Sequence, residues 1–330
     1  MGEWVNAVVD KNNDFRKPWM KWAGTLSCTI GSEATTTTYY NYRRFFDQLN
    51  GFKNLTSLRL ASVRLDSRIT IPKVNVKVLT LENCDVEFDA FAPLVENLPK
   101  LTHLILIEVC TFGCNPPPCG FSQSLRKLSF LKPCHWSVDL IKMFIPAPQW
   151  DEVSISWGNV ESTIYQAFIQ CVGANVIGLD LQGNPGSTYS DASYMGILKK
   201  KSTIVFKSFD LRSCTKLREL KIGNCSYGWD IYIIGTITST EIRKIILTES
   251  RILGLPRYEH NLERGLCALV DRTGAQLEVE FRGDYFLQGD RGVVFEDYLP
   301  YFLQCKGAKV KFVDVEGNII YSWGAQPSHS

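Results

Sequence analysis

The chain has 330 residues, of which 45% are hydrophobic and 21% are charged, and its formal net charge is +2. This is the composition of an ordinary folded protein, and the near-neutral charge provides no overall attraction to nucleic acid or to an anionic membrane surface. No apolar run in the sequence approaches the roughly 20 residues that a membrane-spanning helix needs. We therefore expect neither a nucleic-acid partner nor a membrane partner.

The N-terminus and the cysteines bear on the compartment. Residues 1–4 contain no cationic segment followed by an apolar one, so we predict no secretory signal. The 11 cysteines are scattered along the chain and odd in number, which is not the pattern of a disulfide framework. We expect reduced, mostly buried thiols and a cytoplasmic or nuclear location.

The first 40 residues hold one strand-like alternation, at Leu26, Cys28 and Ile30. A run of threonines at 35–38 follows it and is expected to form a loop. We interpret residues 1–40 as a degenerate first repeat, or an N-terminal cap, for the repeats that come after them.

From residue 55 onward a phrase recurs: an apolar residue, two variable ones, an apolar one, one variable, an apolar one, two variable and then often Cys or Asn. The phrases are spaced by 21, 25, 24, 25, 26, 41 and 25 residues, and they begin at Leu55, Val76, Leu101, Leu125, Trp150, Val176, Leu217 and Ile242. This period and this internal spacing are the leucine-rich-repeat signature. They predict an α/β fold over residues 41–274, a solenoid with a curved parallel sheet on its concave side and helices on its convex side.

Apolar residues three and four apart predict helices between the strand phrases. These helices are expected over residues 42–49, 89–98, 138–144 and 160–172. The 41-residue spacing predicts a loop insertion at about residues 185–210. That insertion contains three consecutive lysines at 199–201, which we interpret as a solvated loop rather than a nuclear-import or phosphate-binding patch.

Beyond Ile242 the rhythm loosens. The pattern predicts a helix over residues 259–270, a strand over 276–281 and a terminal hairpin that turns at 316–318. Because the last unit of a solenoid must cover an exposed core edge, we interpret residues 275–323 as a C-terminal cap and 324–330 as a tail.

The candidate binding surface follows from the phrase itself. Side chains alternate along a strand, so positions one, four, six and nine are expected to face the core while positions three, five and seven face the concave surface. The candidate partner-binding residues taken from these positions are Arg59, Val78, Thr80, His103, Ile105, Ile107, Lys127, Ser129, Leu131, Glu152, Asp180, Lys221, Lys244 and Ile246. Their mixed charges favour protein recognition over tracking of a phosphate backbone.

One group within this surface is apolar where solvent-facing residues are expected. Ile105 and Ile107 lie beside Leu131 and Val78 in the predicted stack. Exposed apolar patches often mark interaction sites. The alternative is that the N-terminal segment or a long loop covers the patch, and the sequence leaves both readings open.

The sequence offers little to catalysis or metal binding. The group that most resembles a metal site consists of Cys110, Cys114 and Cys119, followed by Cys134 and His135. Its spacing is not that of a C-x2-C knuckle. The alternative is that these are incidental buried thiols. No phosphate-binding loop, dinucleotide fingerprint, nucleophile elbow or H-E-x-x-H motif is present. We therefore predict no catalytic residue, no metal and no cofactor, and a protein that is not an enzyme.

The strand phrases, the passage from Phe91 to Leu101 and the ending from Leu299-Pro300 to Phe312 resemble the repeat region of fungal F-box-like proteins. The resemblance covers about residues 40–323. In that family an N-terminal F-box docks on the Skp1-type adaptor of a cullin ubiquitin ligase, and the repeats collect the substrate. The resemblance implies a non-catalytic scaffold that acts as a substrate receptor and binds another protein.

This chain departs from the family at its N-terminus. Residues 1–52 contain no Leu-Pro-x-Glu-like opening of an F-box, so binding to a Skp1-type adaptor is not supported by the residues. A second hypothesis is a repeat-based enzyme regulator, such as a GTPase-activating protein.

Overall fold

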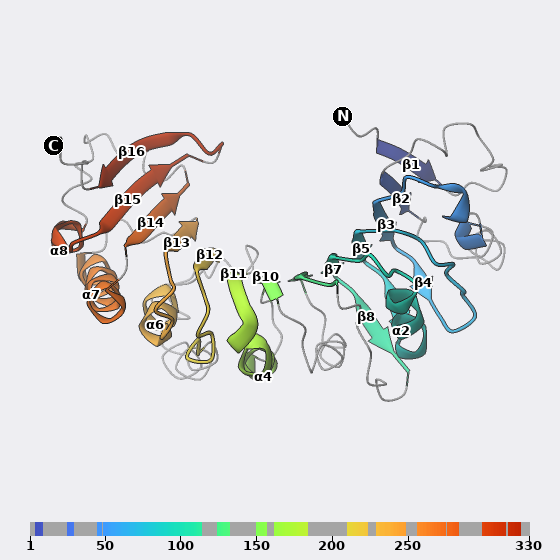
Figure 1. Ribbon diagram of the computed structural model, residues 1–330, viewed down its shortest axis with the longest axis horizontal. Helices are drawn as coiled ribbons and strands as arrows, with labels where there is room; N and C mark the ends of the chain where they lie inside the picture. The colour runs from blue at the N-terminus through green and yellow to red at the C-terminus, as the bar shows by residue number, and fades with distance from the viewer. Residues whose placement is uncertain are drawn as a thin grey trace, which may run out of the picture. The chain divides into compact units, whose positions relative to one another are not determined.

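The computed structural model describes residues 4–8, 25–29, 45–47, 49–113, 124–132, 150–156, 162–183, 210–223, 229–248, 256–274, 276–283, 299–314 and 316–324 (Figure 1). The chain divides into two compact units, residues 1–150 and 151–330. The division falls inside the region 41–274 that the repeats mark out.

The main sheet of the first unit is parallel throughout its described strands. Their order follows the chain: β1 (Trp4–Val8), β2 (Thr25–Thr29), β3 (Ser57–Ala61), β5 (Val78–Glu82), β7 (His103–Ile107) and β9 (Lys127–Leu131). The same phrase position stays in register from strand to strand, so that Leu58, Leu79, Leu104 and Leu128 form one row. A neighbouring row contains Leu60, Leu81, Leu106 and Phe130.

These rows form the core face of the first unit. Every leucine in them is at most 2% exposed, whereas the alternate residues of the same strands are mostly half-buried. Full burial of a leucine side chain contributes about 1.5–3 kcal/mol. The period-two alternation therefore holds each strand in one register, because a slip by one residue would move the whole row into solvent.

Strands β3, β5 and β7 each end in a turn with the same geometry. The next residue has a positive φ, and its backbone N–H donates to the last carbonyl of the following strand, as Ser62 does to Glu82, Asn83 to Ile107 and Glu108 to Leu131. After this turn come the short parallel strands β4 (Arg64–Leu65), β6 (Asp85–Glu87) and β8 (Cys110–Phe112), which form a second sheet. The thiol of Cys84 is 3.3 Å from the carbonyl oxygens of both Leu60 and Glu82, so it satisfies buried backbone at the turn.

Helical segments close the core of the first unit. Helix α2 (Phe88–Glu96) buries Phe91, Leu94 and Val95, and Pro93 lies within it. Phe45 and Phe46, in the helical residues 45–47, are each 1% exposed, and η2 (Leu49–Gly51) buries Leu49.

The second unit contains a sheet whose strands from β11 to β15 are also parallel. The described strands are, in order, β10 (Trp150–Ser156), β11 (Val176–Gln182), β12 (Glu219–Gly223), β13 (Lys244–Thr248), β14 (Leu277–Arg282), β15 (Ala308–Val313) and β16 (Ile319–Gly324). Strand β16 pairs antiparallel with β15. The core row passes through Leu179, Leu220, Ile245, Val279 and Val310.

Helices lie along one side of this sheet (Figure 1). They are α4 (Ser162–Val172), α6 (Trp229–Thr236), α7 (Pro256–Thr273) and α8 (Pro300–Gln304), with the short η4 (Gly173–Asn175) after α4. Leu262, Leu266 and Leu269 of α7, three and four residues apart, are at most 1% exposed. The molecule is thus an α/β protein built on a mainly parallel sheet.

Several sequence predictions are confirmed. The structure has helices α2, α4 and α7 and strand β14 where the periodicity predicts them, and the terminal hairpin is formed by β15 and β16. The alternation at Leu26 and Cys28 belongs to β2, which pairs in register with β3. The predicted helix at 138–144 and the insertion, apart from Asp210, lie outside the described residues.

Strand β1, the small sheet and helix α6 were not predicted. The small sheet escaped because its strands have only two or three residues. Helix α6 escaped because its sequence, WDIYIIGT, is apolar on most sides and lacks the one-sided spacing by which an amphipathic helix is recognised.

Candidate functional site

The face of each sheet that carries phrase positions three, five and seven is called here the open face. In the first unit it consists of three rows in register: Ser57, Val78, His103 and Lys127; Arg59, Thr80, Ile105 and Ser129; Ala61, Glu82, Ile107 and Leu131. All of them except Ala61 are half-buried or exposed. The nine residues that the sequence proposed in this unit, from Arg59 to Leu131, therefore lie on one surface.

Three apolar side chains of this surface are direct neighbours. Ile107 of β7 is the register partner of Leu131 of β9, and Ile105 lies two residues before Ile107 on the same face of β7. All three are half-buried. We call Ile105, Ile107 and Leu131 the apolar cluster. Val78 is the register partner of His103 and reaches the cluster only diagonally, so it lies at its border.

Polar pairs surround the apolar cluster. The Arg59 guanidinium bonds to the Glu82 carboxylate through Nε, at 2.8 Å from Oε2, and through a second nitrogen. His103 Nε2 lies 3.1 Å from Ser129 Oγ. At the adjoining turn, Lys132 Nζ is 3.3 Å from Glu108 Oε1. Exposed pairs of this kind contribute about 0–1 kcal/mol each, so they are a polar rim and not a structural requirement.

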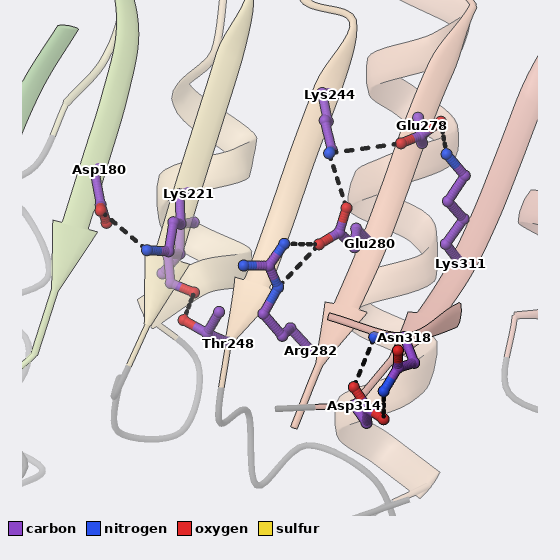
Figure 2. Close-up of polar contacts among 11 residues, drawn as sticks. Asp180, Lys221, Lys244, Thr248, Glu278, Glu280, Arg282, Lys311, Asp314 and Asn318 are labelled. Carbon is purple, nitrogen blue, oxygen red and sulfur yellow. Dashed lines mark hydrogen bonds and ion pairs between the residues drawn. The ribbon is translucent and has the colours of Figure 1, made fainter. Parts of the chain in front are cut away.

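The open face of the second unit carries a connected set of ion pairs, shown in Figure 2. Lys244 Nζ is 2.8 Å from Glu280 Oε2 and 3.7 Å from Glu278 Oε1. Lys311 Nζ is 2.8 Å from Glu278 Oε2, and Arg282 Nε donates to Glu280 Oε1 at 3.0 Å. We call Lys244, Glu278, Glu280, Arg282 and Lys311 the ion-pair network.

A separate pair lies further along the same face. Lys221 Nζ of β12 is 3.1 Å from Asp180 Oδ2 of β11, and the two residues are register partners. The predicted site residues Asp180, Lys221 and Lys244 are thus all engaged in ion pairs, and Glu152 is half-buried on β10.

Glu280 is the most enclosed charge of the network, with a side chain that is 6% exposed. Burial by itself would raise the pKa of Glu280, but the hydrogen bonds and positive charges of Lys244 and Arg282 outweigh it and lower the pKa below the ordinary value. For Lys244, burial opposes the charged form, while the hydrogen bond to Glu280 and the nearby carboxylates raise its pKa above the ordinary value. Both groups are therefore held ionised.

Ile246 corrects the sequence prediction. The phrase places it at position five, among the partner-binding residues, but its side chain is only 5% exposed. Its register partners on the open face are Lys221 and Glu280, whose longer side chains flank it on both sides. The aliphatic parts of long charged side chains can cover a single isoleucine between them, and at 5% exposure Ile246 presents little surface of its own.

The network also contains residues that the sequence prediction missed, namely Glu278, Glu280, Arg282 and Lys311. They were missed because the last recognised repeat phrase begins at Ile242, and these residues lie beyond it. The available signal was the alternation in Leu277–Arg282, which reads LEVEFR. It places two glutamates and an arginine on the face opposite Leu277, Val279 and Phe281.

Counted over the described strands, the open face of the second unit carries five carboxylates and five cations. The carboxylates are Glu152, Asp180, Glu219, Glu278 and Glu280, and the cations are Lys221, Lys244, Arg282, Lys309 and Lys311. This face is therefore close to neutral, and many of its charges already have partners within the chain.

The buried thiols of Cys84 and Cys214 do not form a nucleophilic site. Burial raises the pKa of Cys84 to about 11 and that of Cys214 to about 12, so both remain protonated near neutral pH and are poor nucleophiles. Of the cysteine cluster considered for metal, Cys110 is half-buried, while Cys114, Cys119 and Cys134 lie outside the described residues. Within the described part of the chain, no group of three or more His, Cys, Asp or Glu residues is placed to hold a metal ion.

Comparison with known proteins adds little to this geometry. No family model matches the chain, and no curated protein matches it. Among solved structures, a crystal structure of a Bacteroides fragilis protein, a structural-genomics target, aligns at 9% identity with a TM-score of 0.40 and covers 71% of this chain. The alignment spans 61% of that protein. Among the described helices, none is both long enough and apolar enough to cross a membrane.

Proposed function

We propose that this chain is a leucine-rich-repeat scaffold without catalytic activity, and that it binds another protein through the open face of its first unit. The observation that carries the proposal is the apolar cluster. Ile105, Ile107 and Leu131 stand side by side and half-buried on the face opposite the buried leucine rows. Apolar patches with a polar rim are typical of protein–protein contact surfaces.

The repeat class is supported by three features that recur together. The phrases return every 24–26 residues over most of the series, the strands are parallel with identical phrase positions in register, and the same positive-φ turn follows successive strands. Repeated units of this kind bury a continuous core and leave one sheet face for recognition.

A protein partner suits this face better than a nucleic acid does. Around the apolar cluster the charge of Arg59 is matched by Glu82 and that of Lys132 by Glu108. Nucleic-acid surfaces need several cations with no such compensation, because the affinity comes mainly from phosphate neutralisation. An aliphatic contact from a partner, placed over Ile107 and bordered by these pairs, would instead gain from covering apolar area.

The experiment compares partner capture by matched variants of the full chain. Ile107→Asp and Leu131→Lys place a charge in the apolar cluster. The control Ile319→Asp makes the same kind of change at an isoleucine of β16 that is 60% exposed and belongs to the other unit. Proteins captured from the native cell would be identified by mass spectrometry, and circular dichroism would establish that each variant is folded.

We expect a partner that the wild-type chain and Ile319→Asp retain and that both cluster variants lose. With that partner purified, calorimetry should give a dissociation constant at least about tenfold higher for the cluster variants, as for a central interface residue. Folded cluster variants that bind every partner with wild-type affinity would refute the proposal.

A ubiquitin-ligase role is a narrower proposal, and its support is the resemblance of the strand phrases to F-box-like repeats. It requires an interaction that the scaffold proposal does not, because a ligase subunit of this kind must bind an adaptor. The purified chain mixed with a Skp1-type adaptor should then elute as a complex in gel filtration. Separate elution at micromolar concentrations would remove the ligase role and leave the scaffold proposal standing.

A further inference from the structure

Helices α7 and α8 are joined by a buried carboxylate. Glu263 of α7 is 4% exposed, and its Oε1 accepts hydrogen bonds from the backbone N–H groups of Tyr301, at 2.6 Å, and Phe302, at 3.0 Å. These donors lie in the first turn of α8, where N–H groups have no partner within the helix. The contact fixes the start of α8 against one position of α7.

Two thiols meet one turn further along both segments. Cys267 is four residues after Glu263, and Cys305 is four residues after Tyr301. The two side chains are close enough to interact, and Cys305 Sγ is also 3.5 Å from the Tyr301 carbonyl oxygen. Both cysteines are free and only half-buried, so a small solute molecule can reach them.

The thiol of Cys267 loses its proton less readily than an ordinary thiol. Burial raises the pKa of Cys267 to about 12, and its interaction with Cys305 and the negative charges of Glu263 and Asp271 act in the same direction. A thiol must lose its proton to attack a disulfide. Cys267 is therefore a slow nucleophile toward an external disulfide, and the first attack is assigned to Cys305.

We propose that Cys267 and Cys305 form a reversible disulfide with each other, and that this bond locks α8 onto α7. The oxidant is a small-molecule disulfide such as oxidised glutathione. Chain continuity extends the lock to β15, which begins at Ala308, three residues after Cys305. The disulfide thus fastens β15, the last parallel strand of the described sheet, to α7, the helix that precedes β14 in the chain.

The exchange balances without any other reactant. The Cys305 thiolate attacks one sulfur of oxidised glutathione, which forms a mixed disulfide and releases one glutathione thiolate. Cys267 loses its proton to solvent and attacks Cys305 Sγ, which forms the protein disulfide and releases the second glutathione. Two protein thiols lose two electrons in total, and one glutathione disulfide gains them and becomes two thiols.

The test uses the full chain and three serine variants. Wild-type protein and Cys171→Ser would be incubated with oxidised glutathione beside Cys267→Ser and Cys305→Ser. Cys171 on α4 is an exposed free cysteine, so its variant controls for loss of one accessible thiol. Non-reducing peptide mapping would identify the linked cysteines, and thermal unfolding would be followed with and without dithiothreitol.

We expect a peptide linking Cys267 to Cys305 in the wild-type chain and in Cys171→Ser. A disulfide that closes a loop of this length should raise the unfolding midpoint by about 5–10 °C in a dithiothreitol-sensitive way. Cys267→Ser should accumulate glutathione on Cys305, and neither pair variant should show the rise. Stable glutathione adducts on wild-type Cys305 without the cross-link, or a cross-link to another cysteine, would overturn the proposal.

Discussion

The two units use the same strand positions of a parallel sheet for opposite purposes. On the open face of the first unit these positions carry the apolar cluster with a thin polar rim. In the second unit they carry the ion-pair network, with charges that satisfy each other within the chain. Backbone geometry therefore decides which residues face outward, and the side chains at those positions decide what the face can do.

The difference matters for binding because the two faces respond differently to being covered. A partner that covers the apolar cluster removes apolar area from water, which is favourable by about 25 cal/mol per Å². A partner that covers the ion-pair network must remove water from charges that already have partners, and the desolvation cost can exceed any new attraction. This contrast favours the first unit as the binding surface.

The largest effect on the free energy of unfolding should be one that the two units share. Leu104→Ala in the first unit and Leu220→Ala in the second each remove a side chain with 0% exposure from equivalent core rows. Each change should lower the free energy of unfolding by about 2–5 kcal/mol, through lost apolar burial and a residual cavity. Urea denaturation followed by circular dichroism measures it. A cost below about 1 kcal/mol in only one unit would mean that the cores are not equivalent.

The second-largest effect on the free energy of unfolding should be confined to the second unit. Glu280→Gln leaves Lys244 and Arg282 without the carboxylate that they share, and should cost about 1–3 kcal/mol at neutral pH, discounted for the partial exposure of both cations. The matched control is Glu82→Gln, whose carboxylate is 32% exposed in the first unit and whose loss should cost less than about 1 kcal/mol.

Glu280→Gln should also change how the stability of the protein depends on pH. The pKa of Glu280 in the folded state lies below the ordinary value of 4.5, so its stabilising contribution is present above that pH and is lost as the pH falls through the folded pKa. Wild-type stability should therefore fall more steeply with acid below about pH 4.5 than that of Glu280→Gln. Equal slopes in denaturant titrations at pH 3–5 would remove Glu280 from the account of acid sensitivity.

A smaller contrast concerns the turns at the strand ends. In the first unit Ser62 takes a left-handed conformation, with φ of 56°, whereas after β14 of the second unit a glycine, Gly283, has φ of 148°. Gly283→Ala should cost about 1–2 kcal/mol because an L side chain is strained there. Ser62→Gly should change stability by less than about 1 kcal/mol, in the stabilising direction. Thermal unfolding of the two variants gives the sign of each.

The smallest effect should come from the rim of the apolar cluster. A double-mutant cycle on Arg59 and Glu82 should give a coupling energy of about 0.2–1 kcal/mol, weakened by salt, because both side chains are substantially exposed. The corresponding cycle on Lys244 and Glu280 should give a larger and less salt-sensitive value. Equal couplings in the two units would contradict the distinction between a polar rim and an enclosed network.

Much of the fold could be predicted from residue order. The spacing of Leu79 and Leu81, repeated in Leu104 and Leu106, predicted both the strands and the residues that they bury. Helix α6 and the small second sheet could not be predicted in the same way. The sequence of α6 has no polar face, and strands of two or three residues are too short for a period to be recognised.

The candidate site was predictable in part. The nine proposed residues of the first unit, Arg59 to Leu131, were assigned to one face from period-two alternation alone, and the structure places them there. The prediction that Ile246 is exposed was wrong, because alternation gives the side of the sheet on which a side chain lies but does not show whether neighbouring side chains cover it. Whether an outward side chain meets solvent depends on the length of its neighbours across the sheet, here Lys221 and Glu280.

The sequence by itself determined the α/β class, the parallel strand phrases and the side of the sheet on which the apolar cluster lies, because these follow from local periodicity in a single chain. Only the tertiary structure decided that Lys244 meets Glu280, that Ile246 is covered, and that Cys267 meets Cys305. The two members of each pair are 36 and 38 residues apart in the sequence. Their meeting depends on how separate strands and helices pack, which no local pattern records.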